Sequence, residues 1–441
     1  MFFVNAQSSQ LDEQALERVI REVVETLAPL DRTPCSPGER QAAEWLAARL
    51  RSVRGVHAVE LEDEPSWGTF PPTATGLGVL GMAAATLALR GRRASAALVA
   101  AATFAGIVDE AQNGPRIVRR LVRRRRTTVN LLARIAHGDG PYGSRDPDGH
   151  SEPDGGRPDR ADGPQAGTLV VLAHHDAPQS GVLFRQTLQR WIYERAPRLL
   201  ERGKTPPPQW WFGLAGPLST VAAAASGRRR FARAGLIAGA IGTALVADIW
   251  RNATVPGAND NLSGVAVLVA LAELLSESPI PGVRLLLVSC GAEETLQDGI
   301  RAFVSRHRHE LNPRRTWFVN LDTVGSPHLI MLEGEGPVWM EDYAGPWLRD
   351  MLAAQAQRLG IALERGFRAR SSTDSVIPSR AGYPIATLLS MTDWRSPANY
   401  HLPSDVPANL DYGTVADATR LVYGLAGALA ESHGPQSQTG G

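Results

Sequence analysis

Three short apolar runs after residue 166 each lead into histidine or acidic residues. The first begins at Gly167 (GTLVVLAHHDAP), the second at Gly282 (GVRLLLVSCGAEE) and the third at Thr316 (TWFVNLD). Short, continuous apolar runs are typical of strands that are buried on both faces of a sheet. In an open α/β sheet the carboxyl ends of the strands share one edge, and functional sites assemble there. The pattern therefore predicts an α/β fold whose polar strand ends lie together.

The strand ends carry side chains that suit a metal ion. His174 and Asp176 stand two positions apart and face the same side of an extended segment, so the carboxylate can orient the histidine. Glu293 and Glu294 are consecutive, so one can bind a metal while its neighbour polarises the metal-bound water. Asp322 closes the third strand. Taken alone, each motif is equivocal, and the HxD triplet by itself favours a buried core histidine at His174 over a ligand.

Two loops add further candidates. Asp260 lies in PGANDNLSG, directly before the helical run VAVLVALAELL, where an aspartate is as readily a helix cap as a ligand. Tyr400, His401 and Asp405 lie in a loop before the last predicted helix, 414–429. Together, the strand ends and loops offer two histidines and three carboxylates, with a spare glutamate. These nitrogen and oxygen donors suit zinc in an open site.

The sequence predicts the start of a helix near position 36. Ser36, Pro37 and Glu39 have the spacing of an N-cap, a first helical proline and a capping-box glutamate. The helix that follows carries Ala43, Leu46, Ala47 and Leu50 on one face.

Taken in order, the motifs AHxD, GAxDNxSG, GAEE with a glycine five residues on, NLD and YHxxxD resemble a known family. This family is the co-catalytic di-zinc aminopeptidases, metallopeptidase family twenty-eight, with bacterial leucyl aminopeptidases, glutamate carboxypeptidases and, more distantly, glutaminyl cyclases. The stretch DRTPCSPGERQAAEWLAARL also resembles the family's first helical region. The resemblance implies the zinc exopeptidase fold, a mixed central sheet flanked by helices. We assign it to a discontinuous domain of residues 11–62, 127–178 and 251–432.

The resemblance implies two zinc ions per chain and five ligands: His174, Asp260, Glu294, Asp322 and His401. Asp260 would bridge the two ions. Glu294 and His401 would complete one metal, and His174 and Asp322 the other.

The resemblance also implies catalytic roles. Asp176 would orient His174, Glu293 would be the general base and Tyr400 would steady the oxyanion. Hydroxide bridging the zinc ions would attack the scissile carbonyl after Glu293 takes its proton. Ser375 stands where many members have histidine, which is a departure from the family pattern.

We therefore expect a zinc-dependent exopeptidase that acts on peptides, most readily an aminopeptidase. The alternatives are a carboxypeptidase, a glutaminyl-cyclase-like enzyme, or a catalytically silent binding protein on the same fold. With 46 basic and 45 acidic residues, the chain lacks the basic surplus that nucleic acid binding needs. Two cysteines, Cys35 and Cys290, are typical of free thiols in a reducing compartment.

Two apolar insertions lie outside the resemblance. Residues 73–108 and 210–250 each consist of an apolar run, an arginine-rich turn (RGRR or GRRR) and a second apolar run. We expect two helical hairpins that pack into one four-helix bundle beside the site. Runs of about 14 to 17 residues are shorter than the roughly 20 that span a bilayer. Their continuous apolar character nevertheless suits lipid better than a half-exposed helix.

We therefore expect membrane association through 73–108 and 210–250, the alternative being packed hairpins on a soluble cytoplasmic enzyme. The N-terminal MFFVNAQSSQLDEQ has no basic and apolar signal segment, so we expect a cytoplasmic catalytic domain. Seven arginines in 115–126 form either a solvated face or a contact for anionic lipid headgroups. Residues 139–167, rich in Gly, Pro and Asp, are expected to form a flexible loop, and 433–441 a disordered tail.

Overall fold

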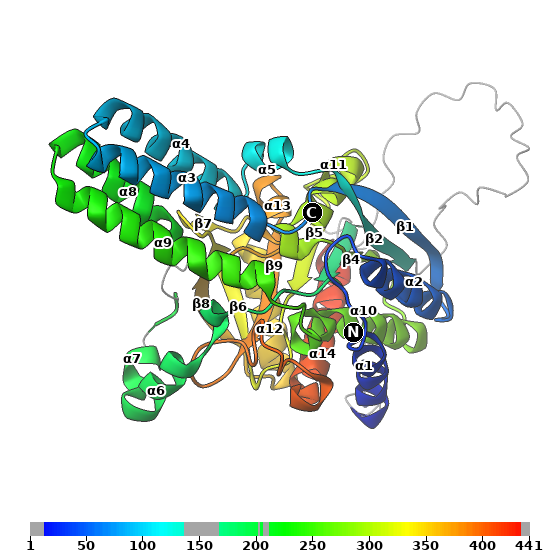
Figure 1. Cartoon of the computed structure of the whole chain (residues 1–441). Coiled ribbons are helices and arrows are strands. Elements are labelled where there is room, and N and C mark those ends of the chain that lie inside the picture. Colours follow the sequence, from blue (N-terminus) through cyan, green and yellow to red (C-terminus); the bar gives the residue numbers. More distant parts are fainter. Residues whose placement is uncertain (1–12, 136–166, 202, 206–210, 434–441) are drawn as a thin grey trace, which may run out of the picture.

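The computed structural model describes residues 13–135, 167–201, 203–205 and 211–433 (Figure 1). Apart from Gly167 and His433, the expected flexible loop and the expected tail lie outside these residues, so both stay predictions.

A mixed nine-stranded sheet forms the centre of the described chain, in the order β1-β2-β4-β3-β5-β9-β6-β7, with β8 paired to β6. The strands are β1 (Val56–Ser66), β2 (Arg126–Ile135), β3 (Gly167–His174), β4 (Val283–Cys290), β5 (Thr316–Leu321), β6 (His328–Glu335), β7 (Glu341–Asp342), β8 (Glu364–Ala369) and β9 (Ile385–Met391). β3 pairs in parallel with both β4 and β5, so the carboxyl ends of these three strands share one edge. Every residue of β3 and β5 is buried, which explains their continuous apolar runs.

Helices cover both faces of the sheet. One core contains α1 (Glu13–Leu27), α2 (Pro37–Arg51), α10 (Ser263–Glu277), α12 (Pro346–Leu359) and α14 (Tyr412–His433), and the other contains α11 (Asp298–His307) and α13 (Val376–Arg380). Successive β3 residues alternate between the two cores, with Leu169 and Val171 in the first and Val170 and Leu172 in the second. The expected mixed sheet flanked by helices is confirmed.

The start of α2 follows the sequence pattern only in part. Ser36 caps the helix, since its Oγ accepts the Glu39 N–H at 3.1 Å. The Glu39 side chain, however, does not complete a capping box. It turns inward and accepts from the Cys35 N–H at 2.9 Å, the Thr128 hydroxyl at 2.7 Å and the Ala292 N–H at 2.8 Å. Glu39 therefore ties α2 to the loop that leads into Glu293.

The two insertions form four helices that lie side by side and project from one end of the sheet (Figure 1). They are α3 (Pro71–Leu89), α4 (Arg93–Ala111), α8 (Trp211–Ser226) and α9 (Arg229–Arg251), of 19, 19, 16 and 23 residues. Three of them are longer than the apolar runs indicated. Glycines let α8 and α9 approach closely, because a Cβ on Gly216 would lie 3.0 Å from the Gly239 Cα. We call these four helices the bundle.

By length and composition alone, four helical segments of the described chain could cross a membrane. Three belong to the bundle: α3, α4 and α9. The fourth, Ala258–Glu277, is 94% buried inside the fold and is therefore a core helix. In α3, α4 and α9 only 28 to 39% of the corresponding window is buried, so most residues of these windows are half-buried or exposed.

The arginine run after α4 is not one uniform surface. Arg116 and Arg119, on either side of the start of α5 (Ile117–Val122), are buried and pair with Asp298 and Glu110, respectively. The interpretation of the whole run as a solvated or lipid-facing surface is therefore wrong for these two arginines. Arg116 thereby joins the segment after α4 to α11, and Arg119 joins α5 to α4.

Candidate metal centre

The Asp260 carboxylate lies between two histidines. Its Oδ1 is 3.4 Å from the His174 Nε2, and its Oδ2 is 3.0 Å from the His401 Nε2. The Glu294 Oε1 is 3.6 Å from the same His401 nitrogen. His174, Asp260 and Glu294 each offer a ligand atom within 4.8 Å of the others. A carboxylate with one oxygen toward each histidine is oriented as a bridge between two metal ions requires.

The sheet explains why these residues meet. His174 is the last residue of β3 and pairs in register with Cys290, the last residue of β4. Beyond Cys290 the chain turns through Ala292, which has a left-handed φ of 50°, into the short helix η3 (Glu293–Thr295). Asp322 follows β5 on the other side of β3. Burial and the negative charge of Asp260 raise the pKa of Asp322 to about 7, while the charge of His174 opposes them.

Asp176 does more than the sequence indicated. Its Oδ1 is 3.5 Å from the His174 Nδ1, a contact longer than a good hydrogen bond. Its two oxygens instead accept the backbone N–H groups of Glu293 and Glu294, each at 3.0 Å. Asp176 therefore holds the turn that carries the two glutamates against the end of β3.

Glu293 is a buried acid beside the predicted ligands. Burial raises its pKa well above the usual range; the charge of His174 opposes this shift, and the carboxyls of Asp374 and Asp322 add to it. The Gln297 Nε2 donates to the Glu293 Oε1 at 2.6 Å. A carboxyl with a raised pKa, next to metal ligands, is suited to take up and return a proton.

The rings of Tyr400 and His401 pack against each other and against Phe184. Their ring centroids are 4.0 Å apart, and the Phe184 ring lies 4.2 Å from His401 and 5.9 Å from Tyr400. Burial raises the pKa of Tyr400 well above its usual range, and the charges of Asp260 and Glu294 add to this effect. The hydroxyl therefore stays protonated and can act as a hydrogen-bond donor.

Residues 245–426 match the model of Peptidase family M28. The resemblance to peptidase family M28 is confirmed. No curated protein sequence matches the chain. This family is zinc-dependent, so the match supports a metallopeptidase.

Solved structures share the fold of this chain. The LapA aminopeptidase of Legionella pneumophila has a TM-score of 0.51 at 11% identity, covering 98% of this chain and 76% of its own. LapB of the same organism has a TM-score of 0.50 at 12% identity, covering 94% and 74%. A glutaminyl cyclase of an Acidobacteriales bacterium has a TM-score of 0.51 at 13% identity, covering 98% and 99%. At these identities the likeness shows the fold alone.

Two further buried residues hold the loop that carries Asp260. Asp405 accepts the backbone N–H groups of Asn259 at 2.7 Å and Asp260 at 3.0 Å. Arg32 is fully buried and donates to the carbonyls of His175 at 2.9 Å and Pro256 at 2.8 Å. Asp405 had a signal, because it closes the YHxxxD motif. No sequence pattern indicated Arg32, because a single arginine in a polar loop does not differ from other surface arginines.

The segment after β8 contributes one further acid. Burial raises the pKa of Asp374 to about 7; the charge of His174 opposes the shift, and nearby Asp176 adds to it. Next to it, the Ser375 Oγ lies 2.6 Å from the Thr387 Oγ1. Ser375, at the position where many members have histidine, is therefore bonded to β9.

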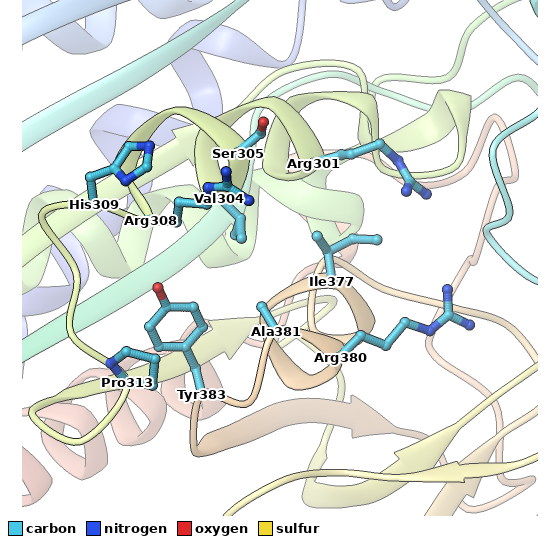
Figure 2. Close-up of a pocket in the computed structure, with 10 residues that line it drawn as sticks. All are labelled: Arg301, Val304, Ser305, Arg308, His309, Pro313, Ile377, Arg380, Ala381 and Tyr383. Carbon is cyan, nitrogen blue, oxygen red and sulfur yellow. The ribbon is translucent and has the colours of Figure 1, made fainter.

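A separate hollow of about 610 Å³ lies between α11 and α13 (Figure 2). It is lined by Arg301, Val304, Ser305, Arg308, His309, Pro313, Ile377, Arg380, Ala381 and Tyr383. None of the predicted ligands or catalytic residues lines it, so we do not assign it to the substrate.

The residues of the site fit zinc. Imidazole nitrogens and carboxylate oxygens are common zinc donors. Several carboxyls are buried together here. Burial raises the pKa of Glu294 well above its usual range, and the charges of Asp260 and Glu293 raise it further. A buried group of acids of this kind is relieved by a bound cation.

We predict that zinc stabilises the protein more as the pH rises. Without metal, the folded-state pKa of Asp322 is raised from 3.8 to about 7. The stability that its protonated form contributes is therefore complete below about pH 4 and lost as the pH rises through about 7. Zinc needs the ionised carboxylates. The difference in Tm between zinc-loaded and chelator-treated protein should grow between about pH 5.5 and pH 8. A difference that stays flat over this range would contradict the placement of these acids at the metal.

Proposed function

We propose that this chain is a zinc-dependent exopeptidase, most readily an aminopeptidase, with Glu293 as its general base. The main support is the Asp260 carboxylate, with one oxygen toward His174 and the other toward His401. The buried acid Glu293 directly precedes Glu294, which belongs to the same group of ligand atoms.

The ligands would be His174, Asp260, Glu294, Asp322 and His401, holding two zinc ions. When bound, zinc lowers the pKa of coordinated water, so a nucleophile is present near neutral pH. Glu293 takes the proton on Oε2, because its Oε1 already accepts from Gln297. It then returns this proton to the leaving amine. The protonated Tyr400 hydroxyl donates to the oxygen on which negative charge develops.

Charge favours the amino terminus of a peptide over its carboxyl terminus. A carboxypeptidase needs a cation that is free to pair with the terminal carboxylate. Arg32 is a buried cation that interacts electrostatically with Asp176 and Asp260. Its N–H groups, however, donate to backbone carbonyls. The acids around Glu293, in contrast, can attract a free amine.

We predict different defects for the two adjacent glutamates. Glu293→Gln should retain zinc and lower kcat by about 10²- to 10⁴-fold, because only proton transfer is removed. Glu294→Gln should lose zinc, because a ligand is removed. Kinetics on aminoacyl-p-nitroanilides and zinc content measure the two effects, with Glu277→Gln at the exposed end of α10 as a matched control.

The same assays separate the alternatives. Substrates with a blocked amino terminus should resist cleavage, and their turnover would argue against an aminopeptidase. Conversion of an amino-terminal glutamine to its cyclic form, without hydrolysis, would identify a glutaminyl-cyclase-like enzyme. A wild-type rate in zinc-loaded Glu293→Gln would show that Glu293 is not the base.

We also propose that the bundle inserts into a membrane and that the catalytic domain is cytoplasmic. Large apolar side chains are exposed on all four helices: Val79, Leu80, Leu98, Phe212, Leu218, Val221, Ile237 and Ile241. At the base of the bundle, Leu121 and Val122 are 80% and 65% exposed beside the exposed Arg120 and Arg124. Apolar and cationic side chains together fit the surface of an anionic leaflet.

We predict that the full chain stays in the membrane pellet after a carbonate wash. α8 has only 16 residues and rises about 24 Å, so the bilayer must thin locally around it. Recovery of the chain in the supernatant without detergent would mean that the bundle is a soluble packing element.

Arginines lie at both ends of the bundle, so orientation is probed separately. Gly91→Cys, at the α3–α4 turn, should react with a membrane-impermeant thiol reagent added to intact cells. The parent chain, whose only cysteines are Cys35 and Cys290, is the control. Labelling of Gly91→Cys only after lysis would contradict the proposed orientation.

A further inference from the structure

Glu293 is held by one neutral side chain. The Gln297 Nε2 donates to the Glu293 Oε1 at 2.6 Å and to the Ser372 carbonyl at 2.9 Å. The Gln297 backbone N–H also donates to the Glu293 carbonyl, at 2.8 Å. Gln297 is 1% exposed, so water does not compete for these bonds.

An amide suits this position for a chemical reason. It donates to one carboxylate oxygen and cannot itself take the proton, so the other oxygen is left to carry it. A cation here would stabilise the carboxylate too strongly for it to serve as a base, and an apolar side chain would leave Oε1 unbonded.

The backbone at Gln297 is unusual. Leu296 and Gln297 both have left-handed φ angles, 70° and 67°. Two consecutive non-glycine residues in this region are unfavourable and persist only where surrounding contacts require them. The turn directs the Gln297 side chain back toward Glu293.

The contacts of Gln297 continue to the bundle. The Ser372 Oγ donates to the Gln297 Oε1 at 3.4 Å and accepts from the Asn113 Nδ2 at 2.8 Å. Asn113 lies two residues beyond the end of α4 and is 3% exposed. Its carbonyl accepts from Arg301 at 3.1 Å and from Arg380 at 3.0 Å. Figure 2 shows these two guanidinium groups on the same side of the hollow between α11 and α13.

We infer that Gln297 is a positioning residue for Glu293, and that Ser372 and Asn113 tie it to the end of the bundle. The contacts that the segment after α4 makes with α11 and α13 thereby set the orientation of the general base. This inference rests on the proposed role of Glu293. It gives the bundle a part in turnover that is separate from zinc binding and from any membrane.

The first test removes the amide and keeps the size of the side chain. Gln297→Leu should lower kcat by about ten- to a hundredfold, with KM and zinc content unchanged, because a hydrogen bond to a charged group is lost. Gln355→Leu, on α12 where it packs near Gly424 of α14, is the matched control and should leave kcat unchanged.

A double-mutant cycle separates positioning from general structural support. If Gln297 acts through Glu293, adding Gln297→Leu to Glu293→Gln should lower kcat no further. Independent, multiplying effects would overturn the inference. If Glu293→Gln alone leaves kcat unchanged, the proposed function fails instead, so the two failures are distinguishable.

The link to the bundle is tested with two mild variants. Asn113→Gly removes the side chain at a position with a left-handed φ of 56°, which glycine tolerates, and Ser372→Ala removes one hydroxyl. Both should lower kcat severalfold and speed amide hydrogen exchange in a peptide spanning 291–300, while zinc content is retained. Asn312→Gly, in the loop before β5, is the control. Unchanged kcat and unchanged hydrogen exchange in both variants would show that the bundle does not affect the orientation of Glu293.

Discussion

A buried carboxylate between two histidines is the interaction on which this site depends. Burial alone would raise the pKa of Asp260, but hydrogen bonds from His174 and His401 bring it below its usual range. Asp260 therefore stays ionised in a place where an isolated charge would be costly. Because its two oxygens face different histidines, residues from β3 and from the loop before α14 are brought to one point.

Buried polar side chains from other elements hold three of the segments that carry predicted ligands. Asp405 binds the backbone at Asp260, Arg32 joins the same loop to the end of β3, and Asp176 binds the turn at Glu293. Glu39, from α2, binds the residue just before that turn. Loops are normally the variable part of a fold, and such ties give them the rigidity that a metal site requires.

Much of this arrangement could be predicted from the chain alone. The apolar runs marked β3, β4 and β5, and parallel pairing accounts for the meeting of His174, Glu294 and Asp322 at one edge. The repeated apolar run, arginine turn and apolar run indicated the bundle, although α9 extends well past its run. These features are local or periodic, so they can be seen in a single sequence.

The features that escaped prediction depend on partners far away in the sequence. Nothing near Glu39 shows that Thr128 and Ala292 will be its partners. An arginine run gives no sign that Arg116 will be buried against Asp298. The same is true of Gln297. Its side chain returns to Glu293 because Leu296 and Gln297 adopt left-handed backbone angles, and neither is a glycine that would have indicated such a turn in the sequence.

The number of zinc ions bound by the purified chain bears most directly on the bridging role of Asp260. Elemental analysis of zinc-replete protein should find close to two ions per chain, and Asp260→Asn should weaken both, because both ions share this ligand. Asp322→Asn should affect one ion more than the other. Absence of bound zinc in the parent chain, or loss of only one ion in Asp260→Asn, would contradict a shared carboxylate at the centre of the site.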